Sequence, residues 1–187
     1  MAISVSVLIL TLNEEFNLPH CLDSLQWCDD VVVLDSGSQD ATQKLAGDWG
    51  ARVVERPFDN YASQRNFGLK EIDYKHHWVL MVDSDEETPR DLVAEINQAI
   101  ESCGEVTTLF RMRRKDHLLG RWIKHSSGYP TWFGRLMKIG HVRVERSINE
   151  EYVTDGKIGY LEAHLHHYPF NKGISAWVEK HNRYSSM

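Results

Sequence analysis

Two aspartates after an apolar run are the residues of this sequence best suited to chemistry. Residues 78–82 are continuously apolar, and Asp83, Ser84 and Asp85 follow them directly. A short run of this kind is typical of a buried strand, so the carboxylates should lie where the chain leaves the sheet. Ligands of open α/β sheets bind at that edge. Converging carboxylates there favour a divalent cation with a phosphorylated ligand, whereas Asp-x-Asp alone also occurs in solvated turns.

Two other apolar runs end in polar residues in the same way. Residues 4–12 predict a strand followed by Asn13 and Glu14, and residues 31–34 predict a strand that ends at Asp35. In a parallel sheet these ends share one edge with the aspartates. A sugar nucleotide needs such an edge, because carboxylates and amides can read the base and ribose while a metal neutralises the diphosphate.

The elements that must position these residues alternate along the first hundred residues. The predicted strands there are 4–12, 31–34, 52–55 and 78–82. Helices are expected after Pro19, over 41–49 with Asp40 as cap, over 58–70, and after a Thr88 cap. Continuous apolar strands alternating with helices predict an α/β fold with a mainly parallel central sheet flanked by helices on both faces. After Gly104 we expect strands near 106–113, 135–139, 141–147 and 158–168, and a helix over 172–186.

Composition sets the remaining limits. Of the 187 residues three are cysteines, and their odd number and wide spacing fit neither a zinc site nor a disulfide framework, which favours a reducing, cytoplasmic compartment. No apolar run reaches the roughly 18 residues of a membrane span. The net charge of −6 is unevenly distributed, since residues 1–105 hold 7 basic and 20 acidic residues and residues 106–146 hold 10 basic and 2 acidic. The basic, aromatic middle suits a phosphorylated glycan or an anionic membrane face, while the acidic first part argues against nucleic acid.

The polar strand ends resemble the motifs of the family 2 glycosyltransferases, which have the Rossmann-like GT-A fold. The motifs are Val-Leu-Ile-Leu-Thr-Leu-Asn-Glu-Glu (7–15), Val-Val-Val-Leu-Asp-Ser-Gly-Ser-Gln-Asp-Ala-Thr (31–42) and Val-Asp-Ser-Asp-Glu (82–86). Four further segments are similar to the bacterial branch that includes lipopolysaccharide core β-glucosyltransferases: 61–68, 128–130, 135–137 and 180–185. The resemblance covers nearly the whole chain. It implies one domain over 1–187, with 1–100 binding the nucleotide sugar and 101–187 facing the acceptor.

The resemblance also implies roles for individual residues. Contacts to the nucleotide sugar, a UDP-sugar, would come from Thr11, Asn13, Glu14, Asp35, Arg65, Asp83 and Ser84. Asp85 would be the direct ligand of Mg²⁺ or Mn²⁺, and His167 would complete the metal site, with His166 as the second choice. Glu150 would be the catalytic base, with Glu151 as the alternative, and Asn149 stands where the family has a histidine.

These roles predict a metal-dependent inverting glycosyltransferase. It would transfer a sugar to a cell-envelope glycan acceptor, such as lipopolysaccharide core or a lipid-linked saccharide, in the cytoplasm or against the inner face of the membrane. A protein that binds nucleotide sugars without catalysis is the alternative that Asn149 keeps open. A nucleotidyltransferase would need a glycine-rich basic loop where the chain has Asn13 and Glu14. Because the last helix-like stretch has no cap, we also expect the chain to be truncated there.

Overall fold

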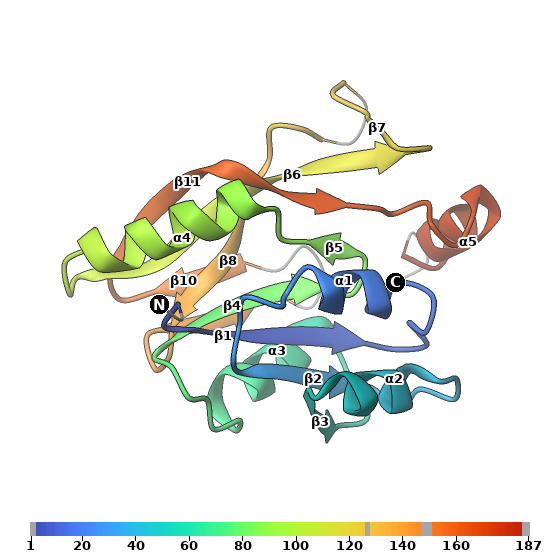
Figure 1. Ribbon diagram of the computed structural model, residues 1–187, viewed down its shortest axis with the longest axis horizontal. Helices are drawn as coiled ribbons and strands as arrows, with labels where there is room; N and C mark the ends of the chain where they lie inside the picture. The colour runs from blue at the N-terminus through green and yellow to red at the C-terminus, as the bar shows by residue number, and fades with distance from the viewer. Residues whose placement is uncertain (1–2, 126–127, 147–150, 185–187) are drawn as a thin grey trace.

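A single large sheet forms the centre of the computed structural model, which describes residues 3–125, 128–146 and 151–184 (Figure 1). Its nine strands run in the order β3-β2-β1-β4-β8-β6-β11-β5, with β7 paired to β6. They are β1 (Val5–Thr11), β2 (Val31–Asp35), β3 (Arg52–Glu55), β4 (Trp78–Asp83), β5 (Glu86–Glu87), β6 (Thr107–Leu118), β7 (Arg121–Trp122), β8 (Trp132–Lys138) and β11 (Lys157–His167). A separate hairpin joins β9 (Val142–Glu145) to β10 (Glu151–Thr154).

Helices cover both faces of this sheet, as the sequence predicts. They are α1 (Leu18–Asp23), α2 (Thr42–Trp49), α3 (Tyr61–Lys70), α4 (Arg90–Ser102) and α5 (Ile174–Tyr184). Apolar residues of α1, α2 and α4 pack on one face of the strands, and those of α3 and β9 pack on the other. Side chains of β1, β2 and β4 alternate between these two cores and are buried in both, which explains their continuous apolar runs.

The register of the parallel strands brings the polar strand ends together. β1 is parallel to β2 and to β4, so Thr11 pairs with Asp35, and Leu10 pairs with Asp83. The carboxyl ends of the three strands therefore form one edge of the sheet. The prediction of a mainly parallel α/β fold with a shared polar edge is confirmed.

The second half of the sheet mixes strand directions. β8 lies antiparallel to β4 and to β6, whereas β11 is parallel to β6. The two-residue strand β5 pairs antiparallel with the end of β11, so that His167 lies opposite Glu86 and His166 opposite Glu87. This pairing ties the turn after β4 to the far end of the chain.

Some local predictions differ from the structure. The strand expected over 106–113 continues to Leu118, because residues 113–116 keep pairing with β11. Thr88 does not cap α4; its hydroxyl donates to the Ser24 carbonyl (2.9 Å) and accepts from Trp27 Nε1 (3.0 Å), which ties α4 to α1. None of the described helices combines the length and apolar character required to cross a membrane.

Candidate active site at the carboxyl edge of the sheet

The loops after β1 and β2 are held together by hydrogen bonds between residues that the sequence predicts for the nucleotide site. Thr11 Oγ1 donates to Asp35 Oδ2 (2.8 Å). The Asn13 backbone N–H donates to Ser38 Oγ (2.8 Å), and Asn13 Oδ1 accepts from the Gln39 N–H (2.8 Å). Asn13 has a φ of 55°, a left-handed conformation that asparagine tolerates better than most residues. The two loops therefore form one unit at the edge of the sheet.

The carboxylate of Asp35 is the centre of that unit. It is fully buried, and besides Thr11 it accepts hydrogen bonds from Gly37 N, Ser38 N, Ser38 Oγ and Gln43 Nε2 at 2.6–3.0 Å. Burial works to raise the pKa of Asp35, but the hydrogen bonds from Ser38 and Gln43 outweigh it and keep the pKa below its usual 3.8. Asp35 thus fixes the shape of the loop that faces the predicted nucleotide site.

Glu14 has a partner from the far end of the chain. Lys172 Nζ lies 2.8 Å from Glu14 Oε1 and donates to the Asn13 carbonyl oxygen (2.6 Å). Asn17 Nδ2 donates to Glu14 Oε2 (2.9 Å). The segment before α5 therefore closes over the turn after β1.

Four charged side chains at the end of β4 form a buried ion cluster: Asp83, Glu86, Arg65 and Arg135. Arg135 Nη2 lies 2.7 Å from both Asp83 Oδ2 and Glu86 Oε1, and Arg65 Nη2 lies 3.3 Å from Asp83 Oδ1. Arg65 also contacts Met81 Sδ (3.0 Å), which fixes its guanidinium beneath the edge. Arg135 and Glu86 are 3% and 1% exposed, so their pairing is screened little by water.

Charge balance in the buried ion cluster separates the two carboxylates. Burial works to raise the pKa of Asp83, but Arg135 and Arg65 hold it well below its usual value. The pKa of Glu86 is raised by burial and by the neighbouring Asp83, against the opposing effect of Arg135. Asp83 is therefore the carboxylate that stays ionised at the edge, while Glu86 anchors Arg135 from below.

Asp85 faces a histidine instead of an arginine. His167 Nε2 lies 3.5 Å from Asp85 Oδ2, and the other ring nitrogen, Nδ1, lies 2.7 Å from Asp116 Oδ1. Burial would lower the pKa of His167, but the hydrogen bond to Asp116 and the Asp85 carboxylate outweigh it and raise the pKa to about 9. The two carboxylates therefore favour the protonated form of His167.

Asp85 and His167, the metal pair, fit a Mg²⁺ or Mn²⁺ ion. Atoms 3.5 Å apart can both reach one ion at bond lengths of about 2.1 Å. Asp116 holds Nδ1, which leaves Nε2 as the ligand, as in many metal-bound histidines. Within the described residues no group of three or more His, Cys, Asp or Glu side chains could hold a metal. Mg²⁺ is commonly bound by one or two carboxylates together with substrate phosphates, and this donor set matches that pattern.

The sequence left two choices open, His166 or His167 as the metal ligand and Glu150 or Glu151 as the base. His166 lies on the opposite face of β11 from His167 and packs against His117, with ring centroids 5.0 Å apart. Ser84 is buried and lines a small hollow of about 10 Å³ beside Asp85. Glu150 lies outside the described residues. Glu151 is exposed and lies 3.2 Å from Arg146 Nη2.

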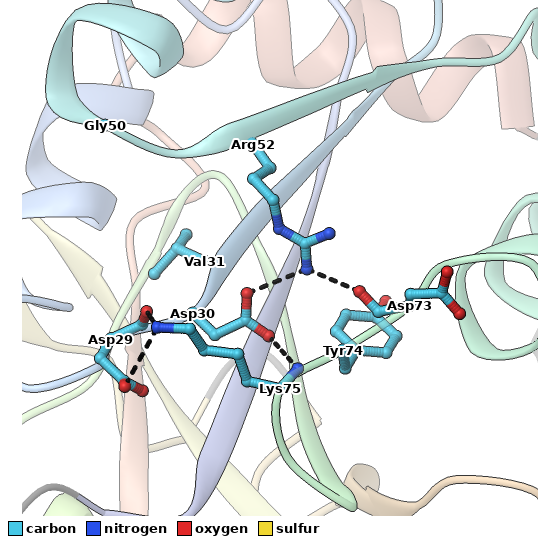
Figure 2. Close-up of a pocket in the computed structure, with 8 residues that line it drawn as sticks. All are labelled: Asp29, Asp30, Val31, Gly50, Arg52, Asp73, Tyr74 and Lys75. Atoms are coloured by element: carbon cyan, nitrogen blue, oxygen red, sulfur yellow. Dashed lines mark hydrogen bonds and ion pairs between the residues drawn. The ribbon is translucent and has the colours of Figure 1, made fainter.

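A larger cavity lies at the opposite, amino edge of the parallel strands. This amino-edge cavity, of about 490 Å³, is lined by Asp29, Asp30, Val31, Gly50, Arg52, Asp73, Tyr74 and Lys75. Figure 2 shows Arg52 between the Asp30 carboxylate (2.9 Å) and the Asp73 carbonyl (2.8 Å). Lys75 Nζ pairs with Asp29 (3.3 Å), so both cations of the lining pair with aspartates. The cavity is the larger hollow, but the residues suited to chemistry lie at the other edge.

Sequence reasoning did not identify several residues of the site. Arg135 belongs to a segment that resembles the bacterial branch. No neighbouring residue in the sequence indicates that it pairs with Asp83 and Glu86. Asp116 is the only acidic residue in the basic stretch 106–144, which is the one signal that could have marked it. Lys172 and Glu86 become partners of the site only through the pairing of distant segments.

Comparison with solved structures identifies the class of fold. Glucosyl-3-phosphoglycerate synthase from Mycobacterium tuberculosis, crystallised with Mn²⁺, UDP and glucosyl-3-phosphoglycerate, matches with a TM-score of 0.50 and 28% identity over 60% of this chain and 44% of its own. S. aureus TarS 1–349 matches with a TM-score of 0.62 over 88% of this chain and 60% of its own. At 17% identity TarS shows the fold alone. Both are GT-A glycosyltransferases.

The chain belongs to glycosyl transferase family 2, whose model matches residues 6–164. LpsC of Rhizobium meliloti (strain 1021), a lipopolysaccharide core biosynthesis glycosyltransferase, is 28% identical over 98% of this chain and 69% of its own length. An uncharacterized glycosyltransferase of Rickettsia felis is 27% identical over 97% of this chain and 68% of its own. The chain thus spans about two thirds of the length of these relatives.

Proposed function

We propose that this protein is a metal-dependent inverting glycosyltransferase that transfers a sugar from a UDP-sugar to a cell-envelope glycan. The observation that carries the proposal is the metal pair at the same edge as the Asp35 loop and the buried ion cluster. Family membership supports the reaction class. The Mn²⁺ and UDP bound to the mycobacterial synthase support the donor and the metal.

In this proposal the first half of the chain holds the donor. The Asp35 loop, with Thr11, Asn13 and Glu14, forms the wall for uracil and ribose, and Asp83 and Ser84 line the floor. Arg65 is fixed by Met81 and Asp83 close to the diphosphate position. A Mg²⁺ or Mn²⁺ ion held by Asp85 and His167 would neutralise the diphosphate as it leaves.

The second half would supply the base. Glu150 directly precedes β10, whose Tyr152 places its hydroxyl 3.8 Å from Met81 Sδ, next to Arg65. Since side chains alternate along a strand, Glu151 points away from Tyr152 and toward solvent. Glu150, which the family resemblance implies as the base, would take the proton from the acceptor hydroxyl while that oxygen attacks the anomeric carbon. A single displacement inverts the configuration at the sugar.

The acceptor and location follow from the relatives and the composition. LpsC acts in lipopolysaccharide core biosynthesis, which supports a lipopolysaccharide core or lipid-linked saccharide as acceptor. The three cysteines are free, which fits a reducing cytoplasmic compartment. We treat residues 1–187 as one GT-A domain, with the donor bound mainly by 1–100 and the acceptor by 101–187.

The metal pair can be tested by thermal denaturation. We expect UDP to raise the melting temperature when Mn²⁺ or Mg²⁺ is present and to have little effect with EDTA. Asp85→Asn should abolish the metal dependence while the unliganded protein stays folded. Asp29→Asn, at the amino-edge cavity, is the matched control and should respond like wild type. Equal stabilisation by UDP with and without metal would contradict the assignment of Asp85.

Catalysis separates this proposal from a protein that only binds nucleotide sugars. Wild-type protein should release UDP from a UDP-sugar in the presence of a lipopolysaccharide core acceptor. Glu150→Gln should reduce that rate at least about 100-fold, because general-base catalysis contributes about 10² to 10⁴. The same variant should keep the metal-dependent response to UDP. UDP binding by wild type without any transfer would favour the binding protein.

A further inference from the structure

A second chemically distinctive surface lies on the outer strands, outside the donor site. We call it the aromatic–basic face and define it by six residues of β6, β7, β8, β11 and the β7–β8 connection: Arg113, Lys115, Trp122, Tyr129, Trp132 and His164. Arg113, Trp132 and His164 lie side by side in the ladder, because Arg113 pairs with the other two across adjacent strands. In Figure 1, β6, β7 and β11 lie at the top of the view and β3 lies at the bottom.

The rings and cations of this face are stacked on one another. Arg113 Cζ lies 4.5 Å from the Trp132 ring centroid and 5.9 Å from that of Tyr129. Lys115 Nζ lies 5.2 Å from the Trp122 ring, and Trp122 packs edge-on against Tyr129 (5.2 Å). Tyr129 in turn stacks on His164 (5.8 Å). Such contacts pre-position both the rings and the charges, which lowers the entropy lost when a ligand binds.

Positive charge on this face is only partly balanced, because Glu162 pairs with Arg113, and Asp91 and Glu87 lie close enough to act on His164 and His166. Lys115 and Lys124 form no ion pair with any residue that the structure describes. Arg113 pairs with Glu162, whose side chain is 76% exposed. Residues 106–146, which supply most of this face, hold 10 basic and 2 acidic residues. An anion would therefore be attracted to this face.

Two buried donors on the face lack acceptors. Trp122 Nε1 and Arg113 Nε are shielded from solvent and have no hydrogen-bond partner among the described residues. A shielded donor without an acceptor is destabilising. Hydroxyl or phosphate oxygens of a ligand would supply the acceptors after small side-chain shifts.

The face is continuous with the donor edge. His117, two residues after Lys115 on the same side of β6, packs against His166 (5.0 Å) and stacks on Tyr168 (5.1 Å). The Tyr168 hydroxyl donates to Glu87 Oε2 (3.1 Å), and its backbone N–H donates to the Asp85 carbonyl (2.9 Å). One end of the face therefore lies beside the turn that holds Asp85, on the side of β11 opposite His167.

We propose that the aromatic–basic face binds the acceptor, and that the acceptor is a saccharide that carries phosphate or carboxylate groups. This inference rests on the proposed transferase function. Aromatic planes suit the apolar faces of sugar rings, and the cations beside them suit anionic substituents. An anionic membrane is the competing partner. We favour the saccharide because the rings are stacked and half-buried, whereas a surface that inserts into lipid needs protruding apolar groups.

The test measures binding without donor, using a deacylated, phosphorylated lipopolysaccharide core oligosaccharide and its dephosphorylated form. We expect Trp132→Ala to weaken binding of both probes about tenfold, as is common for aromatic anchors. Arg113→Ala should weaken binding of the phosphorylated probe about tenfold and have little effect on the other. Phe58→Ala, which changes an exposed ring on the far side of the sheet, is the matched control and should change nothing.

Binding to lipid vesicles tests the competing partner, an anionic membrane. Vesicles of phosphatidylethanolamine and phosphatidylglycerol should not bind in a way that depends on Trp132 or Arg113. The variant Leu119→Asn removes the exposed leucine at the β6–β7 turn and suits its φ of 49°. Vesicle binding that is lost in Leu119→Asn, together with no binding of the oligosaccharide, would overturn the proposal in favour of a membrane surface.

Metal-dependent stabilisation by UDP is the control for folding and for the donor site. Trp132→Ala and Arg113→Ala should retain the metal-dependent stabilisation by UDP, which shows that each variant is folded and that the donor site is intact. A normal UDP response with oligosaccharide binding unaffected by either variant would overturn this inference and leave the proposed function standing. Loss of the UDP response in wild type would instead contradict the proposed function itself.

Discussion

The two edges of the parallel sheet each carry a cluster of acidic and basic residues, but they differ in burial and in charge balance. At the amino-edge cavity, Arg52 and Lys75 have side chains that are 48% and 59% exposed, and each pairs with an aspartate. In the buried ion cluster at the carboxyl edge, Arg135 and Glu86 have side chains that are 4% and 0% exposed. The cations of the larger cavity are therefore more exposed to water than Arg135 of the buried ion cluster.

The difference teaches that the larger cavity is not where this protein gathers its buried charged residues. Exposed ion pairs are screened by water and hold little free energy. Buried charges are costly unless paired, so their presence at the carboxyl edge requires a compensating arrangement. There, Arg135 neutralises Asp83 and Glu86. Asp85 instead faces His167, and in the proposed function a metal ion would bind between these two side chains. Three predictions can break or sharpen this comparison.

Removing the charge of Arg135 should have the largest effect. Arg135→Met keeps the apolar stem but leaves Asp83 and Glu86 without their main partner. We expect a loss of about 3–5 kcal/mol in the free energy of unfolding, measured by urea denaturation, because an uncompensated buried charge remains. Lys75→Met at the amino-edge cavity is the matched control, because both Lys75 and its partner Asp29 are exposed, and it should cost less than about 1 kcal/mol. Similar losses in the two variants would abolish the distinction between the edges.

Asp35→Asn should have an intermediate effect on stability. Asparagine cannot accept all five hydrogen bonds of the carboxylate, so we expect a loss of about 2–3 kcal/mol at neutral pH.

The pH dependence of that loss follows from the lowered pKa of Asp35. Its ionised form contributes stability that is complete above the usual pKa of 3.8 and is lost as the pH falls through the lower pKa of the folded state. In urea titrations at several pH values, the gap between wild type and Asp35→Asn should narrow below about pH 4. Asp48→Asn, an exposed aspartate on α2, should show no such trend. A gap of constant size through the acid range would argue against an ionised Asp35.

Asp116→Ala should have the smallest effect, and it should appear in metal affinity. Without Asp116 the His167 ring loses the partner of Nδ1, so Nε2 is no longer held toward Asp85. We expect Mn²⁺ binding in the presence of UDP, measured by calorimetry, to weaken about tenfold. Asp155→Ala is a suitable control, because Asp155 also pairs with a histidine, His141, but at an exposed site. Unchanged Mn²⁺ affinity in Asp116→Ala would show that Asp116 does not orient the metal ligand.

Much of the donor half could be predicted from local patterns. The apolar runs before Asn13, Asp35 and Asp83 each gave a strand, and their parallel register brought these ends to one edge. The helix over 41–49 began and ended within one residue of the prediction, because Gly50 adopts the left-handed conformation that ends it. The Thr88 cap failed because tertiary contacts to Ser24 and Trp27 took its hydroxyl.

The acceptor half was harder to predict because its key contacts join distant segments. Arg135 and Asp83 are 52 positions apart, and His167 and Asp116 are 51 apart. No local pattern specifies which basic residue neutralises which carboxylate, since the choice depends on strand order. Asp116 stands out as the single carboxylate of the basic stretch 106–144. That observation does not predict His167 as its partner.

The sequence by itself determined the alternating strands and helices, the shared polar edge and the acidic turn at residues 83–85. These follow from the period and length of apolar runs, which are local properties of the chain. Only the tertiary structure decided that Asp83 is neutralised by Arg65 and Arg135, while Asp85 is paired with His167. The physical reason is strand pairing between distant segments: β5 pairs with β11 and brings His167 beside Asp85, while β8 pairs with β4 and brings Arg135 beside Asp83.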